Sequence, residues 1–225
     1  MKRVLVSFSG GQDSTTVLYR CIREFGKEQV HPVHFYYGQR HYPGEAKAVV
    51  MICGILGMEH EQIDFDLSQF GRSVLTEHDK KIPAQSEHKQ GSTVVPFRNT
   101  MFLVHLAAKA VTEDFDVIAL GSTYEDLAEY PDCRPEYFKA MEHALRLADR
   151  HHHLEIYTPY VDVKKSDMSL EGIRLLKVPY EWTHTCYGGE WKKPCRVCDA
   201  CKEREASFEA IGMIDPLIKR LGYGV

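Results

Sequence analysis

Short apolar runs alternate along the chain with longer segments whose apolar residues recur every three or four positions. A short apolar run is typical of a buried strand, and the wider spacing is typical of a helix with one buried face. The expected strands are residues 4–8, 30–37, 62–67, 116–121 and 156–158. The expected helices are residues 14–25, 44–56, 99–111 and 136–149. This alternation predicts an α/β fold, in which a twisted parallel sheet carries helices on both faces.

Two segments interrupt the alternation. Residues 71–93 carry mixed charge, Pro83 and a Gly-Ser-Thr cluster, so we expect a long loop there, of a kind that is often functional or mobile. Residues 188–194 begin a cysteine-containing tail in which we expect mainly loops. The chain is therefore divided into an α/β domain at 1–180 and a small C-terminal segment at 181–225 that packs on the same unit.

A run of three histidines, His151, His152 and His153, follows the last expected helix. Imidazolium groups interact favourably with the negative end of a helix. We therefore interpret the run as a helix C-terminal cap in preference to a metal site.

The composition is that of one globular chain with a small-molecule ligand. Of the 225 residues, 44% are hydrophobic and 27% are charged, which allows a substantial core. The net charge of -4 and the absence of a Lys/Arg-rich run argue against nucleic acid as a partner. A strand begins directly after Lys2 and Arg3, and no run of about 18 apolar residues occurs. We therefore expect a cytoplasmic protein that does not enter a membrane.

Four cysteines crowd into the tail as C-x8-C-x2-C-x2-C, namely Cys186, Cys195, Cys198 and Cys201. Four thiolates at this spacing can close a tetrahedral zinc site, which has no open position and is therefore structural. An iron–sulfur cluster is the chemical competitor, although the C-x3-C-P continuation of a ferredoxin run is missing. Unmetallated thiols are the third interpretation. His184 could replace one thiolate, although we favour a solvated neighbour of the site. Loss of the metal is expected to unfold the tail.

Residues 9–14 read Ser-Gly-Gly-Gln-Asp-Ser and join the first expected strand to the first expected helix. Backbone N–H groups and the helix dipole at such a turn favour an anion, and phosphate is the natural ligand. The turn matches neither G-x-x-x-x-G-K-[ST] nor G-x-G-x-x-G, which weakens kinase-like and dinucleotide-binding interpretations. The alternative is a tight turn in which Asp13 or Ser14 only caps the helix.

The string S-G-G-Q-D-S resembles the S-G-G-x-D-S signature of the PP-loop ATP pyrophosphatase superfamily. The resemblance implies an adenine nucleotide alpha-hydrolase-like fold and an enzyme that transfers AMP from ATP to a substrate oxygen, which turns that oxygen into a good leaving group. It also implies that Asp13 positions magnesium on the phosphates. The residues that it places around ATP are Phe8, Ser9, Gly10, Gly11, Gln12, Asp13, Ser14, Thr15, Thr16, Val17 and Leu18.

Three further segments narrow the family. They are F-Y-Y-G-Q-R-H at 35–41, V-P-F-R-N-T-M-F-L at 95–103 and Y-P-D-C-R-P-E-Y-F-K-A at 130–140. Together with the glycine turn and the cysteine tail, they resemble, in the same order, the 7-cyano-7-deazaguanine synthases (the QueC family) of queuosine-precursor biosynthesis. The resemblance implies ATP-dependent conversion of 7-carboxy-7-deazaguanine and ammonia to the nitrile, through an adenylated carboxylate and an amide. It further implies ATP, Mg²⁺ and one Zn²⁺ per chain, and a homodimer.

The remaining site residues come from matching these segments to the family. Arg98 and Lys165 match basic positions that could steady phosphate charge, which makes them catalytic candidates beside Asp13. An ordinary loop contact for Arg98 and simple solvation for Lys165 are the alternatives. The substrate-binding candidates are Tyr130, Asp132 and Arg134.

Several residues near the substrate segment have two interpretations. The Asp132 carboxylate could accept hydrogen bonds from the N–H donors of a guanine-like edge, or it could cap the turn into the next helix. Cys133 is expected to be a small packed residue and not a nucleophile. Glu129 and Arg196 depart from the family pattern, and Glu129 would add repulsion toward an anionic substrate. The competing hypotheses are a related amide-forming enzyme, a PP-loop tRNA sulfurtransferase and a non-enzymatic nucleotide-binding protein.

Overall fold

The computed structural model describes residues 1–87, 89–149 and 153–223. Five parallel strands form its sheet, in the order β3-β2-β1-β4-β5. They are β1 (Val4–Ser7), β2 (Val30–Tyr36), β3 (Glu61–Asp64), β4 (Val117–Ala119) and β5 (Glu155–Tyr157). The order reverses at β1, which pairs with β2 on one side and with β4 on the other. In such sheets ligands bind outside the carboxyl ends of the strands at the point of reversal.

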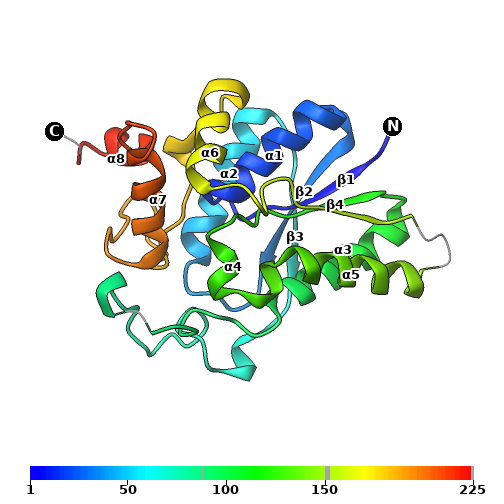
Figure 1. Ribbon diagram of the computed structural model, residues 1–225, viewed down its shortest axis with the longest axis horizontal. Helices are drawn as coiled ribbons and strands as arrows, with labels where there is room; N and C mark the ends of the chain where they lie inside the picture. The colour runs from blue at the N-terminus through cyan, green and yellow to red at the C-terminus, as the bar shows by residue number, and fades with distance from the viewer. Residues whose placement is uncertain (88, 150–152, 224–225) are drawn as a thin grey trace.

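Helices cover both faces of the sheet (Figure 1). The α-helices are α1 (Gln12–Phe25), α2 (Tyr42–Leu56), α3 (Arg98–Glu113), α4 (Asp126–Glu129), α5 (Pro135–Ala148), α6 (Lys165–Glu171), α7 (Asp199–Glu209) and α8 (Pro216–Arg220). Short 3-10 turns lie at Lys27–Gln29, Ser68–Phe70, Gln85–Glu87, Pro131–Cys133 and Tyr180–Trp182, and a π-helical turn lies at Gly172–Leu176. Helices α1, α2 and α6 lie on one side of the strands and α3 and α5 on the other.

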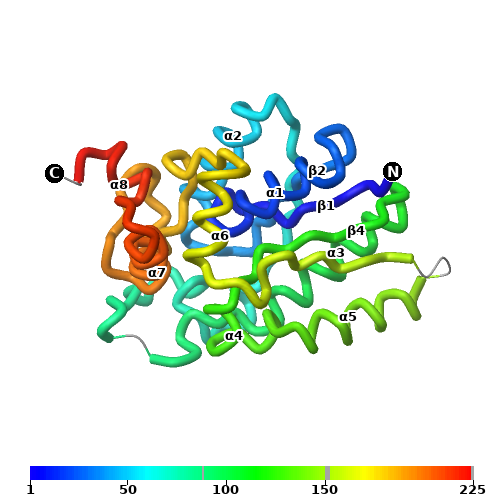
Figure 2. The backbone as a smooth tube through the Cα atoms, turned by 45° about the horizontal axis from the view of Figure 1, so that its top comes forward, coloured from blue at the N-terminus to red at the C-terminus, as the bar shows by residue number. Residues whose placement is uncertain are grey.

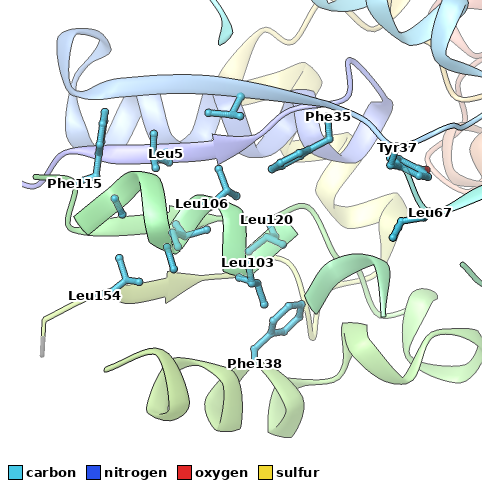
Figure 3. Close-up of a cluster of buried hydrophobic side chains, with 14 of the residues drawn as sticks. Leu5, Phe35, Tyr37, Leu67, Leu103, Leu106, Phe115, Leu120, Phe138 and Leu154 are labelled. Atoms are coloured by element: carbon cyan, nitrogen blue, oxygen red, sulfur yellow. The ribbon is translucent and has the colours of Figure 1, made fainter. Parts of the chain in front are cut away.

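Side chains of β1 alternate between two cores. Leu5 belongs to the cluster that also contains Leu103 of α3 and Phe138 of α5 (Figure 3). Val4 and Val6 point to the opposite face and pack with residues of α1, α2 and α6. Because both faces are covered, the strand reads as an uninterrupted apolar run.

The expected strands and the four expected long helices are confirmed, with shifted ends. Helix α1 begins at Gln12, two residues earlier than expected, because Gly11 takes the extended conformation of an N-cap, with φ −74° and ψ 171°. The third strand ends at Asp64 and not at residue 67. There the Asp66 carboxylate accepts a hydrogen bond from the Ser68 amide at 2.8 Å and turns the chain.

The long loop expected at 71–93 is confirmed, and it links distant parts of the chain. Its described residues form turns and one 3-10 turn, and the Val74 amide donates to the Ser92 carbonyl at 3.0 Å. The Gln85 amide donates to the Val197 carbonyl in the tail at 2.7 Å. The Gly91 amide donates to the Glu129 carboxylate of α4 at 2.7 Å. Figure 2 shows the loop between α7 and α4.

The prediction of a mainly loop-forming tail is wrong for α7 and α8. Phe208 of α7 is fully buried, and its ring lies 5.3 Å from that of Tyr180 in an edge-to-face contact. Arg204 forms a buried ion pair with Asp215, which also caps α8. Helix α7 was missed because its buried face includes polar residues such as Arg204 and Ser207.

None of the helices in the described part of the chain is long and apolar enough to cross a membrane. Of the histidine run, His151 and His152 lie outside the described residues.

Candidate active site

A cavity of about 360 Å³ opens at the carboxyl ends of β1, β2 and β4. Its lining also comes from the first turns of α1, α2, α3 and α6, from α4 and from α7. The cavity therefore lies where the strand order reverses, which is the usual ligand position in a sheet of this kind.

The glycine turn forms one wall of this cavity. The Ser9 amide donates to Ser14 Oγ at 3.2 Å, which closes the turn over the start of α1. Gly10 has φ +73°, and a Cβ there would lie 2.7 Å from the Ala48 Cβ. A Cβ at Gly121, after β4, would lie 2.9 Å from the Ser14 nitrogen. Two glycines thus let three backbone segments meet at the amide end of α1.

Of the eleven residues predicted around ATP, six line the cavity and five do not. Those that line the cavity are Phe8, Ser9, Gly11, Gln12, Asp13 and Ser14. Gly10 lies outside the lining, and so do Thr15, Thr16, Val17 and Leu18, whose side chains are fully buried. The Gln12 amide group donates to Ser169 Oγ at 2.7 Å and to Ser207 Oγ at 2.8 Å, so it joins α1 to α6 and α7.

Asp13 and Lys165 lie together at the start of α1 and α6. Lys165 Nζ lies 3.3 Å from Asp13 Oδ2 and 3.1 Å from Glu203 Oε2 of α7. Burial raises the pKa of Asp13 to about 6, and the Lys165 charge opposes that rise. Burial acts against the charge of Lys165, but the carboxylates of Asp13, Asp126 and Glu203 outweigh it and raise the Lys165 pKa. Lys165 is therefore a fixed cation beside the glycine turn.

Arg98 lies in another part of the same cavity. It is the first residue of α3, and its guanidinium carbon lies 5.8 Å from the centre of the Tyr130 ring. The Tyr130 hydroxyl lies 3.1 Å from Thr93 Oγ1 and 3.4 Å from the Tyr187 hydroxyl. Thr93 of the long loop and Tyr187 of the tail thereby hold the Tyr130 ring beneath the guanidinium.

Of the predicted substrate residues, only Tyr130 lines the cavity. Asp132 accepts a hydrogen bond from the Asn99 amide at 3.0 Å, so it caps α3. Arg134 donates to the Leu127 carbonyl at 3.1 Å. Both lie outside the cavity lining. The 3-10 turn Pro131–Cys133 turns these side chains away while it keeps Cys133 inside.

Cys133 is buried, as expected for a packed residue. The Asn99 side-chain amide donates to its sulfur at 3.1 Å. Burial raises the pKa of the Cys133 thiol to about 12, so the thiol stays protonated at neutral pH. Glu129 lines the cavity and accepts a hydrogen bond from the Gly91 amide, so its carboxylate also holds the long loop.

A buried polar cluster at the carboxyl end of β2 was missed by sequence reasoning. Glu45 of α2 accepts a hydrogen bond from Gln39 Nε2 at 3.0 Å, and its carboxylate lies 3.8 Å from His34 and 3.7 Å from His41. Burial acts against the Glu45 charge, but His41, His34 and Gln39 outweigh it and lower the Glu45 pKa to about 2. The polar residues directly after a buried parallel strand were the available signal.

The four tail cysteines form one cluster with their sulfur atoms all within 4.8 Å of one another. Cys195 Sγ and Cys201 Sγ are 4.0 Å apart, close to the spacing of about 3.8 Å that a tetrahedral zinc–thiolate site requires. A four-iron cluster needs wider spacing, because each thiolate binds a different iron. Backbone amides of Gly188 and Cys195 donate to Cys186 Sγ at 3.2 and 3.3 Å. The donor set fits a single tetrahedral ion.

His184 contacts the cluster through its ring, which bonds the Cys186 backbone, and it is not placed as a ligand. Its Nε2 atom lies 2.9 Å from the Cys186 carbonyl oxygen. The His184 amide donates to the Gly10 carbonyl at 2.9 Å. The chain leading into the metal cluster is thereby bonded to the glycine turn.

The family model and the sequence relatives indicate the same family. The family model described as "Queuosine biosynthesis protein QueC" matches residues 3–212. A 7-cyano-7-deazaguanine synthase from Trichodesmium erythraeum is 36% identical over 97% of this chain and 100% of its own length. One from Thermoplasma volcanium is 37% identical over 96% of this chain and 90% of its own length.

A solved structure supports the fold independently. The U34-tRNA thiolase NcsA from Methanococcus maripaludis, determined with its [4Fe-4S] cluster, superposes with a TM-score of 0.51. The match covers 100% of this chain and 73% of that one at 14% sequence identity. The similarity confirms the PP-loop fold class.

Proposed function

The chain belongs to the QueC family of queuosine biosynthesis proteins, and on that premise we propose that it converts 7-carboxy-7-deazaguanine and ammonia to 7-cyano-7-deazaguanine with ATP. It is thus a carbon–nitrogen ligase. The observation that carries the proposal is one cavity in which the glycine turn, Asp13 and Lys165 face the aromatic and cationic residues Tyr130 and Arg98. The part at the glycine turn suits phosphates, and the part at Tyr130 and Arg98 suits a planar acid.

The reaction proceeds in two rounds that use the same phosphate site. In the first, a carboxylate oxygen attacks the α-phosphate of ATP, pyrophosphate leaves, and ammonia then displaces AMP to give the amide. In the second, the amide oxygen is adenylated, and AMP leaves as a proton is lost and the nitrile forms. Each of the two carboxylate oxygens thus departs with one AMP.

Backbone amides at the start of α1 bind the phosphates, and Lys165 balances their charge. Asp13 holds Mg²⁺ on the phosphates, since its Oδ1 is buried and has no hydrogen-bond partner among the described residues. The residues of α1 from Thr15 to Leu18 support this turn from within the core.

The tail cysteines hold one structural Zn²⁺, which the sulfur spacing supports. Residues 181–225 are proposed to form one folding unit with residues 1–180, through the Gln12 and Lys165 contacts to α7. The active form is proposed to be a homodimer that acts on small molecules and not on nucleic acid. Metal analysis and light scattering of the purified protein test the ion and the oligomeric state.

The direct test is incubation with ATP, Mg²⁺, ammonia and 7-carboxy-7-deazaguanine, followed by mass spectrometry. We expect the nitrile, with two AMP and two pyrophosphate per molecule. Accumulation of amide without nitrile would identify an amide-forming enzyme. ATP binding without turnover of the acid would contradict the synthase proposal and leave a nucleotide-binding protein.

A further inference from the structure

We infer that Arg98 binds the carboxylate of the substrate acid, and that it serves the first round of the reaction and not the phosphates of ATP. This inference rests on the proposed function. It starts from the different surroundings of the two cations that line the cavity, Arg98 and Lys165.

Lys165 already forms ion pairs within the protein. Asp13 and Glu203 lie 3.3 and 3.1 Å from its ammonium group. Arg98 makes no ion pair within 4.0 Å with any residue of the described chain, and its Nε is buried without a hydrogen-bond partner there. Arg98 is half-buried, and Tyr37 is the neighbouring group that acts on it most strongly. A partly desolvated cation without a paired carboxylate is costly, and an anionic ligand removes that cost.

The groups around Arg98 differ from those around the glycine turn. The charges that act on Asp13 are Lys165, Asp126 and Glu203. The groups that act on Arg98 are, in order, Tyr37, Tyr130, Asp132 and Cys133. Of these, Asp132 is engaged by the Asn99 amide. Arg98 therefore belongs to the aromatic part of the cavity, at the ends of β2 and α4, and not to the phosphate turn.

The chemistry of an aromatic acid matches these surroundings. The guanidinium is planar and can bind both oxygens of a carboxylate. Tyr130 lies beneath it at 5.8 Å, and Phe102 and Tyr37 line the cavity nearby. A carboxylate conjugated to a flat ring can lie in the plane of the guanidinium while the ring contacts these aromatic side chains.

The two rounds of the reaction distinguish binding of the substrate carboxylate from binding of the ATP phosphates. ATP is used in both rounds, but the substrate is anionic only in the first, since the amide carries no charge. If Arg98 bound phosphate, it would promote conversion of the acid and of the amide equally. If Arg98 bound the carboxylate, it would promote conversion of the acid far more than that of the amide.

The test measures kcat/KM for 7-carboxy-7-deazaguanine and for its synthetic 7-amide, with wild type, R98M and R98K. For R98M we expect kcat/KM for the acid to fall about 100-fold and that for the amide less than about 10-fold. R98K keeps the charge without the planar fork, so we expect a smaller loss that is still confined to the acid. The amide value of each variant is the internal control for folding and ATP binding.

Equal losses with acid and amide would assign Arg98 to phosphate and overturn the inference, as would no loss with either. If wild type converts neither compound, the proposed function fails, and calorimetry then tests Arg98 by itself. In that case the acid should bind wild type more tightly than the amide, and R98M should lose the difference. Retention of that difference in R98M would also overturn the inference.

Discussion

Lys165 Nζ lies 3.3 Å from Asp13 Oδ2, so the first residue of α6 is bonded to the first turn of α1. Lys165 also reaches Glu203 of α7 at 3.1 Å. Three segments that are far apart in the sequence therefore meet at one ammonium group. The contact places a carboxylate, a cation and the amide end of α1 together, as the proposed transfer of AMP requires.

Replacement of Asp13 by Asn is expected to lower turnover about 100-fold or more, because the neutral amide is a poor magnesium ligand. Since burial raises the Asp13 pKa to about 6, wild type should lose affinity for Mg²⁺–ATP as the pH falls through about 6. Calorimetric titration with Mg²⁺–ATP between pH 5 and pH 8 measures this. Zinc content serves as the folding control, and unchanged activity in D13N would remove Asp13 from the mechanism.

Glu45 is expected to stabilise the fold in a pH-dependent way. Its pKa in the folded state is about 2 against an ordinary value of 4.5, so the stabilisation is complete above the ordinary value and disappears as the pH falls toward 2. The effect also declines above the pKa of His41, which burial lowers below its ordinary 6.5, because the neutral imidazole no longer attracts Glu45. Glu45→Gln should therefore cost on the order of 2 kcal/mol of unfolding free energy near pH 5, and less at pH 3. Urea unfolding at both pH values checks this. A difference that does not change with pH would mean that the variant acts through packing.

Local patterns were sufficient to predict the strands, the long helices and the glycine turn. Each depends on the spacing of neighbouring residues, such as the apolar run at β1 and the two glycines before α1. The cysteine cluster was equally predictable, because its ligands lie close together in the sequence.

The rest of the site depends on contacts between distant segments. Glu203 reaches the cavity because Phe208, on the same helix, is buried against Tyr180. Asp132 and Tyr130 differ by two residues, yet a 3-10 turn sends one to cap α3 and the other into the cavity. Sequence spacing alone does not specify which way such a turn faces.

Removal of the tail metal by a chelator is expected to loosen residues 186–201 more than the sheet. The cysteine loops depend on the ion, whereas the end of α7 is also held by Phe208 against Tyr180. Hydrogen exchange measured by mass spectrometry should show faster exchange across 186–201 and little change in β1. One equivalent of zinc should be released. A coloured protein that contains iron would contradict the zinc assignment.

Gly121→Ala is expected to weaken ATP binding about 10-fold or more, because the new methyl group would collide with backbone and not with a movable side chain. Its Cβ would lie 2.9 Å from the Ser14 nitrogen and 3.0 Å from the Asp13 carbonyl carbon. Relief of this overlap must displace the amide end of α1, at a cost of about 1–3 kcal/mol in unfolding free energy. Gly54→Ala is the matched control: it lies within α2, a Cβ there meets no atom within 4 Å, and it should stabilise the helix by about 0.5–1 kcal/mol. Calorimetry with ATP and thermal unfolding compare the two variants. If G121A bound ATP as tightly as G54A, the amide end of α1 would not be the phosphate site.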